Sequence, residues 1–278
     1  MARIISFVNQ KGGTGKTTIC INLAVGLAHK GKNVLVIDLD FQSNATTGLG
    51  IDRDSINKNS FSLILNETQN PENFIFDTYL QNLKVIPASF DLEIIDTVHK
   101  VNIEKSINLK RSIDTLRDKF DFILIDNPPS ISTITYSTIF ATDYIYVPVE
   151  MSYFGLEGLD QIDEALNAIN YLITEQRNII EKEVGTGEIL FPLKTTEIGG
   201  VIINRWDSRT RISKEIFEIL KNRYGDLLFE TKIRQNTTIK EAIAEGKGII
   251  DYAPSSRGAE DFLKLTEEVL TRESKREI

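Results

Sequence analysis

The chain has almost no cysteine. Only Cys20 is present among 278 residues, so neither a disulfide framework nor a cysteine-based metal site can form within one chain. An iron–sulfur cluster, which needs several thiolates, is excluded for the same reason. A single cysteine fits a reducing cytosol, and we expect Cys20 to be a small buried apolar side chain.

Long apolar runs and linkers are also missing. No stretch approaches the roughly 20 apolar residues of a membrane span, and the N-terminus leads directly into a short apolar run, so we expect no signal peptide. No repeat, low-complexity segment or Pro/Gly-rich linker divides the chain. With 41% hydrophobic and 26% charged residues, the composition is that of a globular protein, and we expect one domain over residues 1–278.

Short apolar runs, continuous rather than alternating, predict strands that are covered on both faces, as in a parallel sheet. The predicted strands are residues 4–8, 34–37, 83–86, 122–125, 144–149, 198–203 and 227–229. Apolar residues at helical spacing separate most of them, for example in residues 19–29 and 155–172, and follow them in 262–270. This alternation predicts an α/β fold with a doubly wound, mostly parallel sheet and helices on both faces.

Two segments are less regular than the rest. Residues 51–80 are polar and rich in asparagine, and residues 174–197 carry many charges together with two glycines. We interpret the second segment as a helix end followed by a lengthened loop.

A glycine-rich loop follows the first predicted strand and precedes the first predicted helix. It reads Asn9-Gln10-Lys11-Gly12-Gly13-Thr14-Gly15-Lys16-Thr17-Thr18. Glycines let the backbone bend so that successive N–H groups point at an anion, and the helix start adds its positive dipole end. This pattern predicts a phosphate-binding loop in which Lys16 reaches the β- and γ-phosphates and the Thr17 hydroxyl coordinates Mg²⁺.

The loop departs from the usual pattern G-x-x-x-x-G-K-[ST]. Gln10 stands where a glycine is usual, and Lys11 adds a second lysine at the start of the loop. A lysine at this position points away from the phosphates of its own loop. It is therefore either a solvated surface residue or a residue that crosses a dimer interface to the phosphates of a partner's nucleotide.

Carboxylates follow two other predicted strands. Asp126 comes directly after residues 122–125, and Asp38 and Asp40 come after residues 34–37. A carboxylate after an apolar strand near a phosphate loop is typical of a Walker B site, so Asp126 is expected to hold Mg²⁺ through its water shell; the alternative is a helix N-cap. At most one of Asp38 and Asp40 is expected to face the γ-phosphate directly.

Together these motifs resemble the ParA/MinD superfamily of dimerising ATPases, whose phosphate loop is a deviant Walker A motif. Residues 11–18 resemble that loop, and Asn9-Gln10 resemble the ParA (Soj-like) branch. The resemblance implies that Lys11 acts across the dimer and that Asp40 orients the attacking water. Phe41 departs from the pattern, because the family usually has proline there.

The resemblance continues to the C-terminal end of the chain, through residues 231–236 and 256–260. It implies that Asn204, which follows a late predicted strand, reads the edge of adenine. An asparagine at a strand end is also a common turn former, so both interpretations stay open.

The charge distribution is uneven. The whole chain has a net charge of −8, whereas residues 204–247 hold ten Lys and Arg against seven Asp and Glu, a net charge of +3. The remainder therefore carries −11. From charge alone this segment is a solvated face with mixed charges; the ParA resemblance favours non-specific DNA binding within roughly residues 204–257. Arg209 and Arg211, at the start of an expected helix, and Arg234, in an expected loop, are our first candidates for DNA contacts.

The resemblance predicts an ATPase that uses ATP and Mg²⁺, with Lys11, Lys16 and Asp40 as its catalytic residues. Its expected partners are a second copy of the chain in an ATP-dependent homodimer, non-specific DNA and a ParB-like adaptor that stimulates hydrolysis. We expect a cytoplasmic, nucleoid-associated protein, without membrane binding, that segregates or positions a plasmid, a chromosome or another cargo. The alternatives are a DNA-independent ATP-dependent enzyme, such as a small-molecule ligase or kinase, and a MinD-like spatial regulator.

Overall fold

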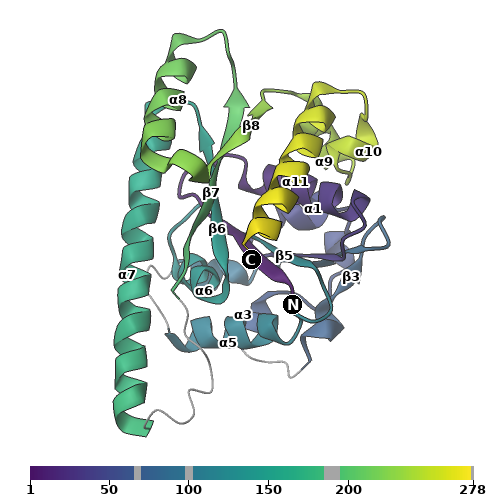
Figure 1. Ribbon diagram of the computed structural model, residues 1–278. Helices are drawn as coiled ribbons and strands as arrows, with labels where there is room; N and C mark the ends of the chain where they lie inside the picture. The colour runs from purple at the N-terminus through teal and green to yellow at the C-terminus, as the bar shows by residue number, and fades with distance from the viewer. Residues whose placement is uncertain (66–69, 98–102, 185–194, 277–278) are drawn as a thin grey trace.

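Apolar β-branched runs form the strands of a single sheet in the computed structural model, which describes residues 1–65, 70–97, 103–184 and 195–276. The sheet has eight strands in the order β3-β4-β2-β5-β1-β6-β7-β8, and it runs through the middle of the molecule (Figure 1). The strands are β1 (Arg3–Phe7), β2 (Val34–Asp38), β3 (Phe76–Asp77), β4 (Leu83–Ile86), β5 (Phe122–Asp126), β6 (Tyr144–Glu150), β7 (Glu197–Trp206) and β8 (Leu228–Arg234).

The strand pairing is parallel except at one edge, where β3 pairs with β4 in the antiparallel sense. The predicted α/β fold is therefore confirmed. Each predicted strand is present within a few residues of its expected bounds. The prediction missed β3, whose two residues are too few to show a pattern, and it made β8 five residues too short at its C-terminal end.

Helices connect the strands on both faces of the sheet. They are α1 (Lys16–His29), α2 (Asn44–Gly48), α3 (Phe61–Leu65), α4 (Leu92–Asp96), α5 (Ile103–Asp114), α6 (Thr133–Ala141), α7 (Tyr153–Val184), α8 (Arg211–Tyr224), α9 (Thr238–Ala244), α10 (Ile249–Tyr252) and α11 (Arg257–Lys275). None of the helices in the described ranges is both long enough and apolar enough to cross a membrane.

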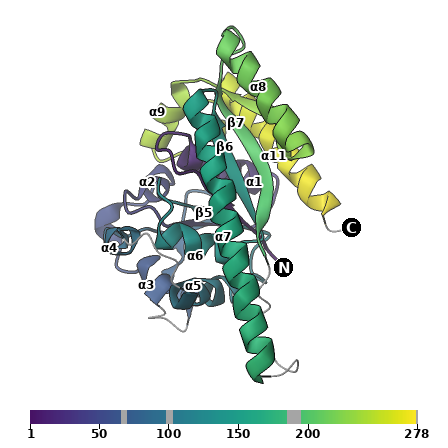
Figure 2. The same ribbon diagram turned by 90° about the vertical axis from the view of Figure 1, so that its left-hand side faces the viewer.

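Successive residues of β5 show why the sheet needs cover on both faces. Phe122 and Leu124 belong to a core cluster that includes residues of α1 and α11. Ile123, between them, belongs to a second cluster with residues of α5 and α6. A third cluster joins β6 and β7 to α7 and α8, which stand along the other end of the sheet (Figure 2). The continuous apolar runs of the sequence thus correspond to strands that are buried from both sides.

The longest helix exceeds its expected length. The sequence predicted a helix over residues 155–172, whereas α7 spans Tyr153–Val184 and extends past the lower end of the molecule (Figure 1). The lengthened loop predicted for the following segment falls largely on residues 185–194, which lie outside the described residues. The irregular segment 51–80 contains α3, β3 and two short 3₁₀ turns, Arg53–Ser55 and Pro71–Phe74.

The strand register brings polar residues together at the carboxyl edge of the sheet. Phe7, the last residue of β1, pairs with Asp126 of β5, and Asp126 pairs with Asp38 of β2. The ends of three adjacent strands therefore lie level with one another. Ligands of open parallel sheets bind at this edge.

A buried hydrogen-bond network holds the chain just after β2. The Asp38 carboxylate accepts hydrogen bonds from the backbone N–H of Thr46, at 2.8 Å, and from the Thr46 hydroxyl, at 2.7 Å. The same hydroxyl oxygen accepts a bond from the backbone N–H of Ala88 at 3.0 Å. Thr46 is fully buried, so one hydroxyl group joins α2, β2 and the segment after β4.

We expect Thr46→Val to lower the free energy of unfolding by about 2–3 kcal/mol, because it removes one hydrogen bond to the buried Asp38 carboxylate and leaves the buried N–H of Ala88 without its partner. Urea unfolding followed by circular dichroism measures the change. Thr47→Val is the matched control, since the exposed Thr47 hydroxyl donates only to backbone carbonyls within its own turn. Equal losses in the two variants would contradict the assignment.

Candidate active site

The glycine-rich loop links β1 to α1 in a conformation that needs glycine. Gly13 and Gly15 have φ angles of 80° and 99°, in the left-handed region that other residues rarely adopt. At Gly15 space is also missing, because an added Cβ would lie 2.1 Å from the side-chain nitrogen of Asn204. The predicted loop is therefore present, with α1 beginning at Lys16, so that the positive end of the helix dipole faces the loop.

Lys16 points into the molecule. Its side chain is buried and its Nζ donates a hydrogen bond to the backbone carbonyl of Asn9 at 2.9 Å. Burial lowers the pKa of Lys16, and the negative charges of Asp126 and Asp40 oppose that shift. An ammonium held this deeply attracts an anion strongly, because little water screens it.

Asp126 is the last residue of β5 and is fully buried. Neither carboxylate oxygen has a hydrogen-bond partner in the described part of the chain. Burial and the charge of Asp38 raise the pKa of Asp126 well above its usual range, while the nearby Thr17 hydroxyl lowers it. Since α6 begins only at Thr133, the N-cap interpretation of Asp126 is wrong.

The two aspartates after β2 face different surroundings, as expected. The carboxylate of Asp38 is directed at Thr46 and is fully buried, and that burial raises its pKa to about 7. Asp40 lines a pocket, accepts a hydrogen bond from the backbone N–H of Gln42 at 3.0 Å, and has a pKa raised chiefly by burial. Of the two, Asp40 is therefore the residue that can act on a molecule in that pocket.

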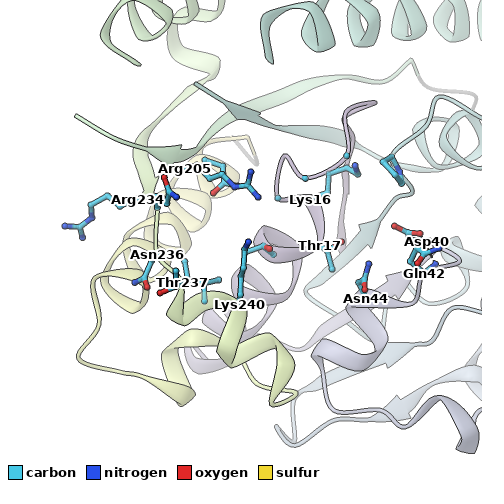
Figure 3. Close-up of a pocket in the computed structure, with 18 residues that line it drawn as sticks. Lys16, Thr17, Asp40, Gln42, Asn44, Arg205, Arg234, Asn236, Thr237 and Lys240 are labelled. Atoms are coloured by element: carbon cyan, nitrogen blue, oxygen red, sulfur yellow. Dashed lines mark hydrogen bonds between the residues drawn. The ribbon is translucent and has the colours of Figure 1, made fainter. Parts of the chain in front are cut away.

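The pocket has a volume of about 460 Å³, within the usual range for small-molecule sites. Figure 3 shows its lining side chains converging from the loop, from the segment after β2 and from the C-terminal third of the chain. The lining residues are Gly12, Gly13, Gly15, Lys16, Thr17, Thr18, Asp40, Gln42, Asn44, Pro129, Asn204, Arg205, Arg234, Gln235, Asn236, Thr237, Ile239 and Lys240. Thr14 of the loop is fully buried and does not line the pocket.

The sequence pattern did not indicate one wall of this pocket, which is formed by residues 235–237, 239 and 240. These residues follow β8, at the same carboxyl edge as the loop. The rule that ligands bind beyond the carboxyl ends of parallel strands would have indicated them, had β8 been assigned its full length.

Lys11 pairs with a residue of β6, outside the pocket. Its Nζ forms an ion pair with Glu150 at 2.9 Å and lies 5.9 Å from the centre of the Phe154 ring. It does not line the pocket that contains Lys16. Whether this lysine contacts the phosphates of a partner's nucleotide stays a prediction.

Asn204 lies within β7, not in a turn, so its interpretation as a turn former is wrong. Its side-chain nitrogen donates a hydrogen bond to the backbone carbonyl of Thr14 at 2.7 Å. The residue is buried and borders the pocket. In this structure Asn204 therefore supports the glycine-rich loop directly.

The three arginines proposed for DNA binding differ in their surroundings. The side chains of Arg209 and Arg211 are 87% and 92% exposed; Arg211 begins α8 as expected, whereas Arg209 lies in the turn before the helix. Arg234, in contrast, is the last residue of β8 and not part of a loop, so that expectation is wrong. Its guanidinium forms ion pairs with Asp261 at 2.6 Å and Glu260 at 2.7 Å, and these contacts hold β8 against α11.

Comparison with known proteins decides the family. A profile described as an AAA domain matches residues 2–181. The sporulation initiation inhibitor protein Soj of Bacillus subtilis is 35% identical over 97% of this chain and 98% of its own length. The chain belongs to the ParA (Soj-like) ATPase family. The chromosome partitioning protein ParA of Caulobacter vibrioides is 30% identical over 99% of this chain and 96% of its own length.

The fold is that of the ParA/MinD ATPases. The septum site-determining protein MinD of Pyrococcus horikoshii, solved in complex with Mg-ADP, superposes with a TM-score of 0.70 at 27% identity. The superposition covers 97% of this chain and 96% of that protein. As a ParA-type ATPase, the chain converts ATP and water to ADP and phosphate.

We expect Asn204→Ala to weaken binding of ATP and GTP alike by about fivefold, because it removes a hydrogen bond that supports the loop. Isothermal titration with both nucleotides measures this. Asn44→Ala, which alters another polar residue of the pocket lining, serves as the control. A change in the ratio of ATP to GTP affinity would show instead that Asn204 reads the base.

Proposed function

We propose that the chain acts as a single ATPase domain that dimerises when it binds ATP and uses the dimer to position a cargo. The observation that carries the proposal is that the side chains of the two lysines in one loop point in different directions. Lys16 is directed inward, next to Asp40 and Asp126, whereas Lys11 is directed outward, away from the pocket. One lysine is thus available to the chain's own nucleotide and the other to a nucleotide outside it.

ATP and Mg²⁺ fit the residues at the carboxyl edge of the sheet. In this proposal the loop residues 12–18 bind the phosphates, and Lys16 contacts the β- and γ-phosphates. Thr17 and Asp126 hold the magnesium ion, because the buried Asp126 carboxylate has no partner among the described residues and lies beside the Thr17 hydroxyl. A bound magnesium ion supplies positive charge for the phosphates and so lowers the barrier to phosphoryl transfer. Asn204 lies beside the nucleotide, where it supports the loop or reads the adenine.

Asp40 is the residue we assign to the attacking water. Its carboxylate lies in the pocket on the same side as Lys16 and is fixed by the backbone N–H of Gln42. Phosphoryl transfer to water depends on positioning and charge neutralisation, so no protein nucleophile is required. In this role the Asp40 carboxylate accepts a hydrogen bond from the water. It thereby orients the water so that a lone pair of the water oxygen faces the γ-phosphate.

We expect Asp40→Ala to lower the hydrolysis rate by about 10²-fold or more while ATP still binds, because only the positioning of water is lost. The variant should therefore accumulate as an ATP-bound dimer in size-exclusion chromatography. Lys11→Ala is the matched opposite: it should bind ATP but stay a monomer. A Lys11→Ala protein that dimerises like the unaltered chain would contradict the assignment of Lys11 to the partner's nucleotide.

We propose that the ATP-bound dimer binds non-specific DNA. The supporting observation is a set of exposed basic residues on α8 and in the turn before it, Arg209, Arg211, Lys214 and Lys221. In the described part of the chain, Arg209 pairs with Asp207 and Arg211 pairs with Glu215, both at the surface. Such exposed pairs contribute about 0–1 kcal/mol, so DNA phosphates can replace these carboxylates.

A cytoplasmic, nucleoid-associated location follows from this proposal, with a ParB-like adaptor that stimulates hydrolysis and a plasmid, a chromosome or another assembly as cargo. Arg234 now has a smaller part in it than the sequence suggested, because its guanidinium is already paired with two carboxylates. Its replacement is expected to loosen the contact between β8 and α11 before it affects DNA.

We expect the double variant Arg209→Ala and Arg211→Ala to weaken DNA binding of the ATP-bound protein. The slope of the logarithm of the binding constant against the logarithm of the salt concentration should become shallower by about one for each lost phosphate contact. Fluorescence anisotropy with random duplexes, with and without ATP, measures both. Arg223→Ala is the control, because Arg223 lies on the same helix but pairs with Asp163 of α7. Equal affinity with and without ATP would favour a DNA-independent enzyme.

A further inference from the structure

Glu150, the last residue of β6, contacts two cations at once. Its Oε2 forms an ion pair with Lys11 Nζ at 2.9 Å, and its Oε1 forms another with the guanidinium of Arg205. The side chain of Glu150 is 14% exposed, compared with 37% for Lys11 and 44% for Arg205. A largely buried carboxylate therefore joins the start of the glycine-rich loop to the end of β7.

Further contacts fix the backbone at Lys11. The side-chain oxygen of Asn9 accepts a hydrogen bond from the Lys11 N–H at 2.9 Å, and the Asn9 side-chain nitrogen donates to the carbonyl of Pro148 at 2.7 Å. The start of the loop is thereby attached to β6. With its backbone fixed and its ammonium paired to Glu150, Lys11 lies along the surface of its own chain.

Arg205 makes it possible for Lys11 to leave this arrangement. A buried carboxylate that loses its only cation is strongly destabilised, but Glu150 keeps the guanidinium of Arg205 when Lys11 departs. Arg205 has a φ angle of 53°, unusual for a residue other than glycine, and it also borders the nucleotide pocket. The Lys11–Glu150 pair can therefore open at low cost, while Glu150 stays compensated.

We propose that Glu150 is a positioning residue that holds Lys11 in the monomer and competes with the phosphates of a partner's nucleotide for its ammonium. The inference rests on the proposed function, in which Lys11 crosses to that nucleotide. Each protomer must break one Lys11–Glu150 pair before the dimer closes. Glu150 thus raises the concentration of ATP-bound protein at which dimers form, and it limits dimerisation in the absence of nucleotide.

The test compares Glu150→Gln with Glu157→Gln in the full chain. Both substitutions remove one negative charge close to Lys11, since Glu157 borders the same small surface hollow as Lys11 and Phe154. Only Glu150 is ion-paired with the lysine. General repulsion between two acidic protomers is therefore reduced equally in both variants, and any difference reports on the ion pairs of Glu150 with Lys11 and Arg205.

We expect Glu150→Gln to tighten the ATP-dependent dimer by about two- to fivefold for each protomer, and so by about four- to twenty-five-fold overall, from the strength of a single partly exposed ion pair. Sedimentation velocity at several protein concentrations measures the dimer dissociation constant. Affinity of the monomer for ATP should not change, and Glu157→Gln should stay within twofold of the unaltered chain. Glu150→Asp, whose shorter side chain cannot span both cations, should act in the same direction but more weakly.

A second measurement follows the pair without any dimer. Acylation of Lys11 in the nucleotide-free monomer, quantified by mass spectrometry, should be at least twofold faster in Glu150→Gln than in Glu157→Gln, because a side chain that Glu150 no longer holds is more accessible to the reagent. If the unaltered chain dimerises with ATP and Glu150→Gln changes neither the dimer dissociation constant nor the labelling of Lys11, the inference about Glu150 is overturned while the proposed function stands. If the unaltered chain forms no dimer with ATP, the proposed function falls, and the inference falls with it.

Discussion

Buried charge at the carboxyl edge of the sheet is the constraint on which the rest of the site depends. Asp38 and Asp126 are completely buried, and Asp40 and Lys16 are nearly so. Burial raises the pKa of each carboxyl group and lowers that of the lysine, because the charged forms lose their hydration. Three acidic groups share one basic group, so the site in isolation favours further positive charge. The phosphate loop, in contrast, favours an anion. A nucleotide with a bound metal ion provides a cation for the carboxylates and an anion for the loop.

The sheet is what allows such a cluster to persist. The level ends of β1, β5 and β2 are set by continuous backbone pairing, and the apolar layers on both faces exclude water from it. Another buried carboxylate, that of Glu273 in α11, lies against the central strands. It accepts a hydrogen bond from Tyr146 of β6 at 2.9 Å and forms an ion pair with Arg3 of β1 at 3.0 Å. The C-terminal third, which supplies one wall of the pocket, is thus attached to the same central strands.

The sequence predicted those parts of the site whose signal is local. The glycine spacing identified the loop, and a carboxylate at the end of an apolar run identified Asp126, because strand and loop chemistry extend over only a few residues. The partners of Arg234 could not be predicted, since Asp261 lies on α11 and meets the strand only after folding. The contact between Asn204 and Thr14 joins positions 190 residues apart and was hidden for the same reason.

Helix α7 shows a different kind of limit. Regular apolar spacing predicted its first part, but the helix continues to Val184. The sequence has no proline or glycine between residues 159 and 184, so nothing interrupts the backbone where the amphipathic pattern weakens. Apolar periodicity indicates where a helix packs against a core, whereas helix-breaking residues indicate where it ends. For α7, the first glycine after this stretch indicates the end of the helix better than the apolar periodicity does.

The position of Asn204 also has a thermodynamic consequence. Only four residues separate it from Arg209, so the segment that supports the glycine-rich loop leads directly into the exposed turn before α8. If an occupant of the pocket shifts the end of β7, the arginines after it shift as well. Linkage then requires the effect to run both ways: whatever binds at the arginines must change the affinity for nucleotide by the same factor. Two ligands on opposite ends of one short segment would regulate each other without any long path through the protein.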